Sequence, residues 1–197
     1  MCEDASDRSR RLLLFHRQCF KGSLMTSDFS IRDMRRDEYP LLETFLYEAI
    51  FQKGCASPLP RTIVHEAELS RYFEGFGGAH DRCLVAECDR IVVGAVWVRL
   101  FTEEAPGFGF VDAMTPELSI SLLGAYRNRG IGTDLVQTML RTLREKRYLQ
   151  VSLSVQRENP AIRLYRRVGF RVVRECGDDC IMLYRLASGQ QSMIALQ

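Results

Sequence analysis

A glycine-rich turn at residues 127–132, Arg-Asn-Arg-Gly-Ile-Gly, constrains the fold of this chain more than any other stretch. Before the turn, residues 117–122 alternate between polar and apolar side chains, which is the period of a β-strand. After it, apolar residues recur at three- and four-residue steps from Ile131 to Leu143, which is typical of an amphipathic helix. The unpaired N–H groups at the start of such a helix, together with its dipole, favour the binding of a phosphate group.

A second strand is predicted after this helix, because residues 149–156 again alternate between apolar and polar side chains. A strand, a helix and a strand at this spacing predict a right-handed crossover between two parallel strands. The glycine turn then lies at the carboxyl end of the first strand.

Upstream of the crossover, the sequence predicts further strands and helices. They are a strand at 29–34, a helix from Asp37 onward, a helix after Pro58 and Pro60 that ends in the glycine cluster 75–78, and strands at 83–88 and 91–101. The last two strands should form an antiparallel hairpin around a tight turn at Asp89-Arg90. The strand at 91–101 is apolar almost throughout, so it should be central and covered on both faces. Residues 102–114 are expected to form a loop.

Downstream of the crossover, a last helix has clear boundary signals. Asn159 is a favourable N-cap, Pro160 suits the first helical position, and Gly169 supplies the stop. Residues 170–174 and 180–186 should then form a hairpin that completes the sheet.

Composition limits the classes of function. A chain of 197 residues with 46% hydrophobic and 26% charged residues suits one soluble globular domain. A net charge of +2 provides no dominant basic field, so nucleic acid is not expected as a partner. No apolar run approaches the roughly 20 residues that span a bilayer, so no membrane association is expected. Residues 1–28 and 187–197 are predicted to be a flexible N-terminal extension and a C-terminal tail.

The cysteines favour a reducing compartment. There are seven, with no C-x-x-C pair, at positions 2, 19, 55, 83, 88, 176 and 180. This pattern argues against a disulfide framework or a zinc site, and we expect a cytoplasmic protein. Cys176 and Cys180 could face each other across a hairpin, although two reduced thiols near a turn is the favoured interpretation.

Other phosphate-binding motifs fit the turn poorly. A Walker P-loop needs Lys-Ser or Lys-Thr after its last glycine, whereas Thr133-Asp134 follows here. A Rossmann fingerprint needs a third glycine and an acidic residue at the end of the next strand, and this sequence has neither. A plain tight turn into a helix would explain one glycine better than two glycines beside two arginines.

Two motifs resemble those of one superfamily. Arg127 to Gly132 matches the R/Q-x-x-G-x-G/A signature of the GNAT N-acetyltransferases. Asn159-Pro160-Ala161, with Leu164-Tyr165 and Gly169-Phe170, matches their second signature, N-x-A-x-x-L-Y-x-x-x-G-F. The resemblance covers about residues 29–186, and the order of the predicted elements agrees with it.

The resemblance implies a fold, a domain and a co-substrate. The fold would be α/β (α+β), with a mixed, mostly antiparallel sheet of six to seven strands, splayed central parallel strands and about four helices. The acetyltransferase domain would span residues 29–186. Acetyl-CoA would be the acetyl donor and no metal would be required. Its pyrophosphate would lie on the N–H groups of residues 128–133, and its pantetheine arm would pair with residues 120–122.

The resemblance also implies individual cofactor contacts. They are Ile120, Ser121, Leu122, Arg127, Asn128, Arg129, Gly130, Ile131, Gly132, Thr133, Asn159 and Tyr165. Asn159 would order the cofactor arm, cap its helix, or do both.

Acyl transfer to an amine needs an N–H group for the oxyanion, a base for the amine and an acid for the leaving thiolate. The resemblance implies the Leu122 N–H for the first task and Tyr165 for the acid, since a phenol stays protonated at neutral pH. Glu117 would be the base, directly or through water, or else a solvated carboxylate at a strand end. Some relatives place a glutamate five residues before the motif asparagine, where this sequence has Ser154, so a mechanism that depends on that glutamate cannot be transferred.

Two functions of different class remain open. The first is acetyl transfer from acetyl-CoA to a primary amine of a small molecule or peptide, and the second is a catalytically silent module that binds acetyl-CoA. The acceptor groove would lie near residues 45–76 and 101–110. Its candidate aromatic and acidic residues are Phe51, Tyr72, Phe73, Phe76, Phe108, Phe110, Glu48, Glu103 and Glu104. The oligomeric state is left open, with a homodimer as one option, and His65 and His80 are interpreted as incidental.

Overall fold

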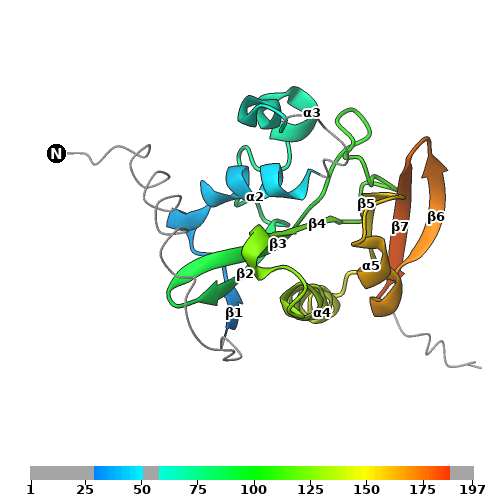
Figure 1. Ribbon diagram of the computed structural model, residues 1–197. Coiled ribbons are helices and arrows are strands. Elements are labelled where there is room, and N and C mark those ends of the chain that lie inside the picture. The colour runs from blue at the N-terminus through cyan, green and yellow to red at the C-terminus, as the bar shows by residue number, and fades with distance from the viewer. Residues whose placement is uncertain (1–28, 51–57, 187–197) are drawn as a thin grey trace, which may run out of the picture.

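A seven-stranded sheet runs through the protein in the order β1-β2-β3-β4-β5-β7-β6 (Figure 1). The computed structural model describes residues 29–50 and 58–186. The strands are β1 (Ser30–Asp33), β2 (Arg82–Cys88), β3 (Ile91–Arg99), β4 (Glu117–Leu122), β5 (Gln150–Gln156), β6 (Arg171–Cys176) and β7 (Asp179–Arg185). β4 and β5 are parallel and every other neighbouring pair is antiparallel. The predicted mixed, mostly antiparallel sheet is therefore confirmed.

Helices cover both faces of this sheet (Figure 1). The α-helices are α2 (Leu41–Ala49), α3 (Ala67–Ser70), α4 (Ile131–Glu145) and α5 (Ile162–Val168), and the 3-10 helices are η1 (Arg36–Glu38), η2 (Arg61–His65) and η3 (Gly124–Tyr126). α4 and α5 pack on one face, and α2, η2 and α3 pack on the other. No helix of the described ranges is long and apolar enough to cross a membrane.

The predicted stripe of α4 forms the centre of the first core. Leu135, Met139 and Leu143 are completely buried, and Ile131 is only 2% exposed. α4 also carries the connection between the parallel strands β4 and β5, as the crossover predicts.

The second core lies on the opposite face of the sheet, where α2 covers β3. Phe45 of α2 and Trp97 of β3 are both buried in it. On the other face of β3, Val96 and Val98 belong to the first core. The prediction that this strand is central and covered on both faces is confirmed.

Helix boundaries upstream of β2 differ from the predictions. The first predicted helix is divided at Pro40 into η1 and α2. The second is divided at Glu66, which has an extended backbone, into η2 and the single turn of α3. Residues 62–64, Thr-Ile-Val, are all β-branched, which lowers helix propensity in this stretch.

The predicted turns and thiols are found where the sequence places them. Asp89 and Arg90 both have positive φ values, of 51° and 66°, as the two central residues of a tight hairpin turn with right-handed strand twist require. β6 and β7 form the predicted second hairpin. In it Cys176 lies opposite Asp179 rather than Cys180, and both cysteines are free thiols.

Some predictions concern residues outside the described ranges. They are the N-terminal extension 1–28, the tail 187–197, the aromatic Phe51, and Cys2, Cys19 and Cys55.

Candidate active site

β4 and β5 are neighbours in the sheet, but they are paired at one position only, Glu117 with Ser152. The Leu123 N–H donates to the Val93 carbonyl at 2.9 Å, so these two residues are a hydrogen-bonded pair of the β3–β4 ladder. Hydrogen-bonded and non-hydrogen-bonded pairs alternate along an antiparallel ladder. Leu122 therefore directs its N–H and C=O groups away from β3 and toward β5. Beyond the Leu118 N–H, which completes this single pairing, no strand of the described ranges pairs with this edge of β4.

The same alternation applies two residues earlier, so Ile120 also directs its backbone groups toward β5. The Leu122 carbonyl is engaged by Arg127, whose Nε donates to it at 2.9 Å. Nη2 of this arginine donates to the Glu48 carbonyl and to its carboxylate, both at 3.1 Å. Arg127 therefore links the glycine turn to the end of β4 and to α2.

The glycine turn itself opens α4. Gly130 is the N-cap with a φ of 87°, and Asn128 has a φ of 62°, so both adopt the left-handed conformation that glycine and asparagine tolerate best. Ile131 and Gly132 are the first two residues of the helix, and their N–H groups have no acceptor within it. The Thr133 N–H is engaged, since it donates to the Gly130 carbonyl at 2.8 Å.

Close packing holds this turn against the strand edge. A Cβ atom at Gly132 would lie 3.3 Å from the Leu164 side chain and 3.4 Å from the Leu122 side chain. Arg129 is exposed, and its guanidinium lies 5.5 Å from the centre of the Tyr126 ring. The start of α4, the end of β4 and α5 thus meet at one place.

The Ser121 side chain makes a hydrogen bond within the fold. Its hydroxyl donates to the Phe45 carbonyl of α2 at 2.6 Å, and the side chain is buried. Because Ser121 lies opposite Ala95 in a hydrogen-bonded pair, its backbone groups point toward β3. The geometry favours a structural role for Ser121 in place of the predicted cofactor contact.

Glu117 is a buried carboxyl group rather than a solvated strand end. The residue is 4% exposed, and its Oε1 accepts a hydrogen bond from the Tyr72 hydroxyl at 2.7 Å. That hydroxyl accepts in turn from the Phe108 N–H at 2.6 Å. Burial raises the pKa of Glu117 from its ordinary value of 4.5 to about 7, and the Tyr72 hydrogen bond opposes part of the rise. A carboxyl group with this pKa can accept and release a proton near neutral pH.

The loop between β3 and β4 encloses this carboxyl group. A Cβ atom at Gly107 would overlap Glu117 Oε2, and one at Gly109 would lie 2.7 Å from the Leu153 carbonyl carbon and 2.8 Å from the Ser154 nitrogen of β5. The Phe108 ring stacks on Tyr72 with ring centres 6.0 Å apart. Only glycines allow the loop to pass this close to both strands.

Tyr165 lies on the buried face of α5. It is 8% exposed, and its ring contacts Phe170 edge to face with centres 6.0 Å apart. Burial raises the pKa of the phenol above its ordinary value, so the hydroxyl keeps its proton at neutral pH. Within residues 29–50 and 58–186, no group hydrogen-bonds to this hydroxyl, so its proton is available for donation.

Asn159 shapes the entry to α5. Its side-chain Oδ1 accepts from the Ala161 N–H at 2.9 Å, and its carbonyl accepts from the Ile162 N–H at 3.1 Å. The helix proper begins at Ile162, and it ends at Gly169 with a φ of 116°. Asn159 therefore caps the turn that precedes the helix, three residues earlier than the helix proper.

The predicted acceptor residues have mixed surroundings. Tyr72, Phe73, Phe76 and Phe110 pack in or against the second core, whereas Phe108 is 50% exposed. Glu103 and Glu104 are exposed at the β3–β4 loop. His65 lies 3.3 Å from Glu43, and His80 lies 2.8 Å from the Tyr148 hydroxyl, which is consistent with incidental roles.

The sequence alone did not predict which residues surround the Glu117 carboxyl group. In the structure they are Tyr72, Gly107 and Gly109. The sequence predicts Tyr72 for the acceptor groove, and it predicts Gly107 and Gly109 only for the loop 102–114. The run Gly-Phe-Gly at 107–109 was the available signal, since alternate glycines permit close backbone approach.

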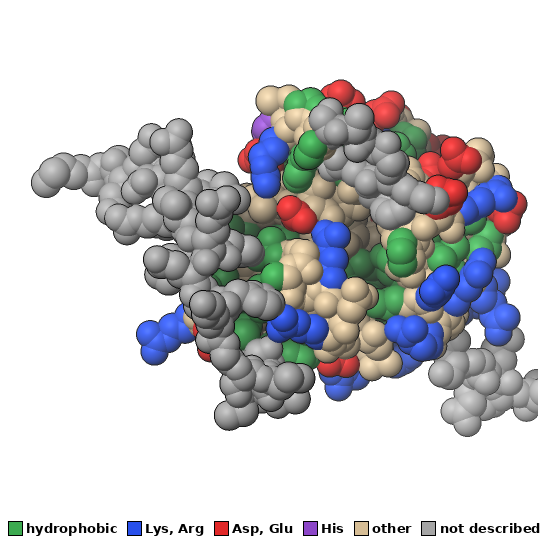
Figure 2. Space-filling view, in the orientation of Figure 1, with side chains coloured by type: hydrophobic (Ala, Val, Ile, Leu, Met, Phe, Trp, Pro, Cys, Tyr) green, Lys and Arg blue, Asp and Glu red, His purple; other side chains and the backbone are tan. Residues whose placement is uncertain are grey.

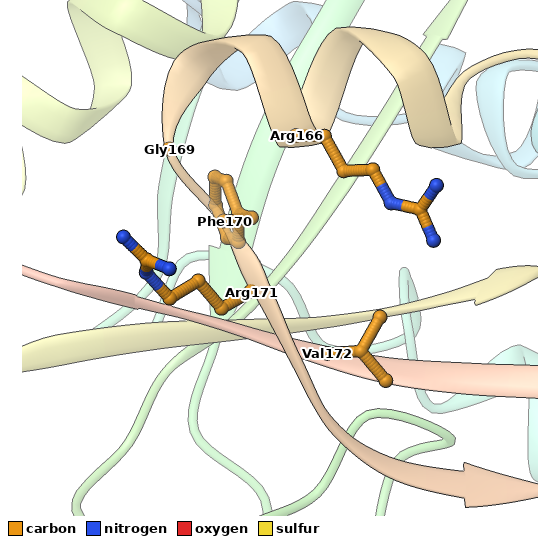
Figure 3. Close-up of a pocket in the computed structure, with 5 residues that line it drawn as sticks. All are labelled: Arg166, Gly169, Phe170, Arg171 and Val172. Carbon is orange, nitrogen blue, oxygen red and sulfur yellow. The ribbon is translucent and has the colours of Figure 1, made fainter.

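Two cavities of the described ranges lie along α4, α5 and the β6–β7 hairpin, and neither is lined by Glu117, Leu122 or Tyr165. One of about 370 Å³ is lined by Arg166, Gly169, Phe170, Arg171 and Val172, and its two arginines point in different directions (Figure 3). A second of about 450 Å³ runs along α4. In the described ranges, no group of three or more His, Cys, Asp or Glu side chains could hold a metal ion.

Known proteins share both sequence and fold with this chain. A mycothiol acetyltransferase of Corynebacterium aurimucosum is 31% identical over 110 residues, which are 55% of this chain and 32% of that protein. An N-alpha-acetyltransferase of Sulfurisphaera tokodaii is 35% identical over 103 residues, which are 46% of this chain and 56% of that protein. The chain thus matches less than two thirds of the length of either relative.

Among solved structures, yncA of Salmonella typhimurium, determined with its cofactor acetyl-CoA, has the same fold. The TM-score is 0.61 at 19% identity, over 83% of this chain and 96% of that chain. The sequence model of the acetyltransferase (GNAT) family matches residues 32–170. The chain therefore belongs to the acetyltransferase (GNAT) family.

Proposed function

We propose that this protein is an acetyl-CoA-dependent N-acetyltransferase whose acceptor is a primary amine of a small molecule or peptide. The observation that carries the proposal is the meeting of three features: the open edge of β4 at Leu122, the glycine turn at the start of α4, and a buried Tyr165 whose hydroxyl has no hydrogen-bond partner among the described residues. Family membership supports acetyl transfer as the chemistry.

The residues present suit the acetyl donor. Ile131 and Gly132 offer unpaired N–H groups at a helix N-terminus, where the dipole favours the pyrophosphate. Ile120 offers the backbone groups of a strand edge to an amide group of the pantetheine arm. Leu122 offers its N–H to the thioester end of the donor, because Arg127 engages its carbonyl. Further contacts beside these groups are proposed for Arg127, Asn128, Arg129 and Asn159. Ser121 and the Thr133 N–H are not proposed as donor contacts, because both already make hydrogen bonds within the fold.

Each step of acetyl transfer can then be assigned to a group in a suitable protonation state. The acceptor nitrogen attacks the thioester carbonyl, and the Leu122 N–H stabilises the oxyanion that forms. Glu117 accepts the proton that the nitrogen loses, since its carboxylate is available at and above a pH of about 7. When the carbon–sulfur bond breaks, Tyr165 donates its proton to the departing thiolate.

Charge favours a cationic acceptor. The elements on the α2 side of the sheet are rich in acidic residues, namely Glu43, Glu48, Glu66, Glu68, Glu74, Glu103, Glu104 and Asp112. Figure 2 shows acidic side chains at the top of the molecule, over α3. An ammonium group approaching this side is attracted, whereas an anionic acceptor is repelled.

The test of this function is Tyr165→Phe. We expect a loss of kcat of about 100-fold or more, because the phenyl ring keeps the packing and removes the acid. The dissociation constant for acetyl-CoA should stay close to that of the unmodified protein. Thiol release from acetyl-CoA, measured over a panel of amines, peptides and aminoglycosides, gives the rates, and calorimetry gives the affinity.

Tyr184→Phe is the matched control, because Tyr184 is a half-buried tyrosine against the same core. Its kcat should equal that of the unmodified protein. Full turnover by Tyr165→Phe would show that Tyr165 is not the acid that protonates the thiolate. Tight binding of acetyl-CoA without thiol release for any amine would favour a silent cofactor-binding module.

A further inference from the structure

Two buried polar atoms stand out in the part of the chain that the structure describes. Glu117 Oε2 and Ser152 Oγ are the two buried side-chain oxygen or nitrogen atoms there without a hydrogen-bond partner. Ser152 is 0% exposed and Glu117 is 4% exposed. Buried polar groups almost always have a partner, because an unpaired one keeps the full penalty of losing water.

The two atoms belong to residues that are paired across β4 and β5, and we call this pair a rung of the sheet. Glu117 and Ser152 are the residues at which β4 and β5 pair, and the Ser152 N–H donates to the Pro116 carbonyl at 3.0 Å. The residues on either side of Ser152, Val151 and Leu153, lie in the core under α4. Side chains alternate along a strand, so Ser152 faces the opposite side, where Glu117 meets Tyr72.

Loop residues close the space around this rung. Gly107 and Gly109 pass against the Glu117 carboxyl group and the β5 backbone. On the other side, Gln150 Nε2 donates to Thr115 Oγ1 at 2.8 Å, and Thr115 Oγ1 donates to Asp112 Oδ1 at 2.8 Å. Gln150, Thr115 and Asp112 are thus engaged with one another. The Gly109 backbone lowers the pKa of Glu117, but it makes no hydrogen bond of standard geometry to Oε2, so both atoms lack a partner among the described residues.

The position of Glu117 makes direct proton transfer difficult. A strand rises about 3.3 Å per residue, so the five steps from Glu117 to Leu122 cover roughly 16 Å. A glutamate side chain spans only a fraction of that distance. On the same face, Ser119 of β4 and Ser154 of β5 lie two residues beyond the rung and continue a polar line toward Leu122.

We propose that Ser152 Oγ and Glu117 Oε2 together bind one water molecule, which is the last member of a proton path from the acceptor amine to Glu117. Ser152 is then a positioning residue for the base, and this role rests on the proposed acetyltransferase function. The amine proton passes to water beside Ser119 and Ser154. The water at Ser152 releases one proton to Glu117 Oε2 as it receives another, so it is restored while the carboxylate becomes a carboxylic acid.

A purely structural serine would behave differently. If the Ser152 hydroxyl were buried without water, Ser152→Ala would remove an unsatisfied group and raise the melting temperature, with activity unchanged. If the hydroxyl holds water for Glu117, the same change should lower kcat about 10-fold or more and leave the melting temperature unchanged or slightly lower.

The experiment measures Ser152→Ala for kcat, for the acetyl-CoA dissociation constant and for the melting temperature. Ser70→Ala is the matched control, since Ser70 is another buried serine, whose hydroxyl donates to Glu74 away from β4 and β5. We expect kcat to fall only in Ser152→Ala, with acetyl-CoA affinity kept in both variants. In a Glu117→Gln background, Ser152→Ala should have no further effect on kcat.

Ser152→Cys provides a second variant of similar size, with a weaker donor, and its kcat should lie between those of serine and alanine. Turnover in both Ser152 variants equal to that of the unmodified protein, with a raised melting temperature in Ser152→Ala, would overturn the inference. The proposed function would survive that outcome. Absence of thiol release by the unmodified protein with every amine would overturn both.

Discussion

At the scale of single residues, Glu117 has the most unusual environment. It is buried between β4 and the Gly107–Gly109 segment, and within the described ranges its one hydrogen bond of standard geometry comes from Tyr72. Burial disfavours the charged form, so the pKa rises to about 7. The burial that gives Glu117 the pKa of a base near neutral pH therefore lowers the stability of the folded protein when the carboxyl group ionises.

This cost gives a prediction for Glu117→Gln. The folded pKa of about 7 exceeds the ordinary value of 4.5, so the carboxyl group is without penalty below pH 4.5 and becomes increasingly destabilising as pH rises to about 7. Glu117→Gln removes this penalty, so the free energy of unfolding of the variant relative to the unmodified protein should rise by roughly 3 kcal/mol between pH 4.5 and pH 8. Urea unfolding at several pH values measures it.

Glu103→Gln is the control for Glu117→Gln, because Glu103 is exposed in the loop that precedes β4. Its relative stability should not vary with pH across this range. A difference for Glu117→Gln that is also flat between pH 4.5 and pH 8 would contradict the raised pKa.

At the scale of elements, the glycine turn positions the start of α4, while other residues anchor the helix. Gly130 holds the left-handed conformation that starts α4, and Gly132 lets the helix approach Leu122 and Leu164. The helix is anchored by its buried stripe, which is independent of the turn. The turn can therefore be altered while the helix remains packed.

Gly130→Val tests this separation. A Cβ atom at Gly130 would meet nothing within 4 Å, so the expected effect comes from the φ of 87°, which a β-branched residue rarely adopts. We expect the turn to rearrange and the affinity for acetyl-CoA to fall by about 100-fold or more, with a stability loss of about 1–3 kcal/mol. Calorimetric titration and thermal unfolding measure the two effects.

Gly124→Val is the matched control for the turn, since its Cβ atom would also meet nothing and its φ is not positive. Acetyl-CoA affinity should be kept in that variant. Retained micromolar binding by Gly130→Val would defeat the assignment of the phosphate to this turn.

At the scale of the whole molecule, charge is unevenly distributed. Exposed arginines gather on α5 and β6, where Figure 2 shows blue side chains at the lower right, and Figure 2 shows acidic side chains along the top of the molecule. The arginines are Arg163, Arg166, Arg167, Arg171 and Arg174. A net charge of +2 hides this separation. The basic side favours approach of the polyanionic CoA moiety.

Ionic strength should therefore act on the donor. Raising salt from about 0.05 to about 0.5 M shortens the screening length and should raise the KM for acetyl-CoA several-fold, with kcat little changed. Replacing Arg163 and Arg166 together by alanine should reduce this dependence, whereas Arg90→Ala, at the β2–β3 turn, should not. A KM that is independent of salt would contradict electrostatic guidance of the donor.

Much of the fold was predictable because its signals are local. The period of residues 117–122, the stripe of α4, and Gly169 at the end of α5 each act over a few residues, and the structure has each element where the sequence predicts it. The stretch 61–70 was predicted less well. There, apolar spacing suggested one helix, while three β-branched residues and the extended Glu66 divide it.

The sequence by itself determined the family, the glycine turn and the order of the elements, because motif spacing and hydrophobic period are properties of neighbouring residues. Only the tertiary structure decided the state of the candidate site. Glu117 is buried because Tyr72 and Phe108, 45 and 9 residues away along the chain, meet at its carboxyl group. Ser121 is engaged because α2 lies across β4. Burial, and the pKa that follows from it, depends on contacts between distant segments, and no local pattern records them.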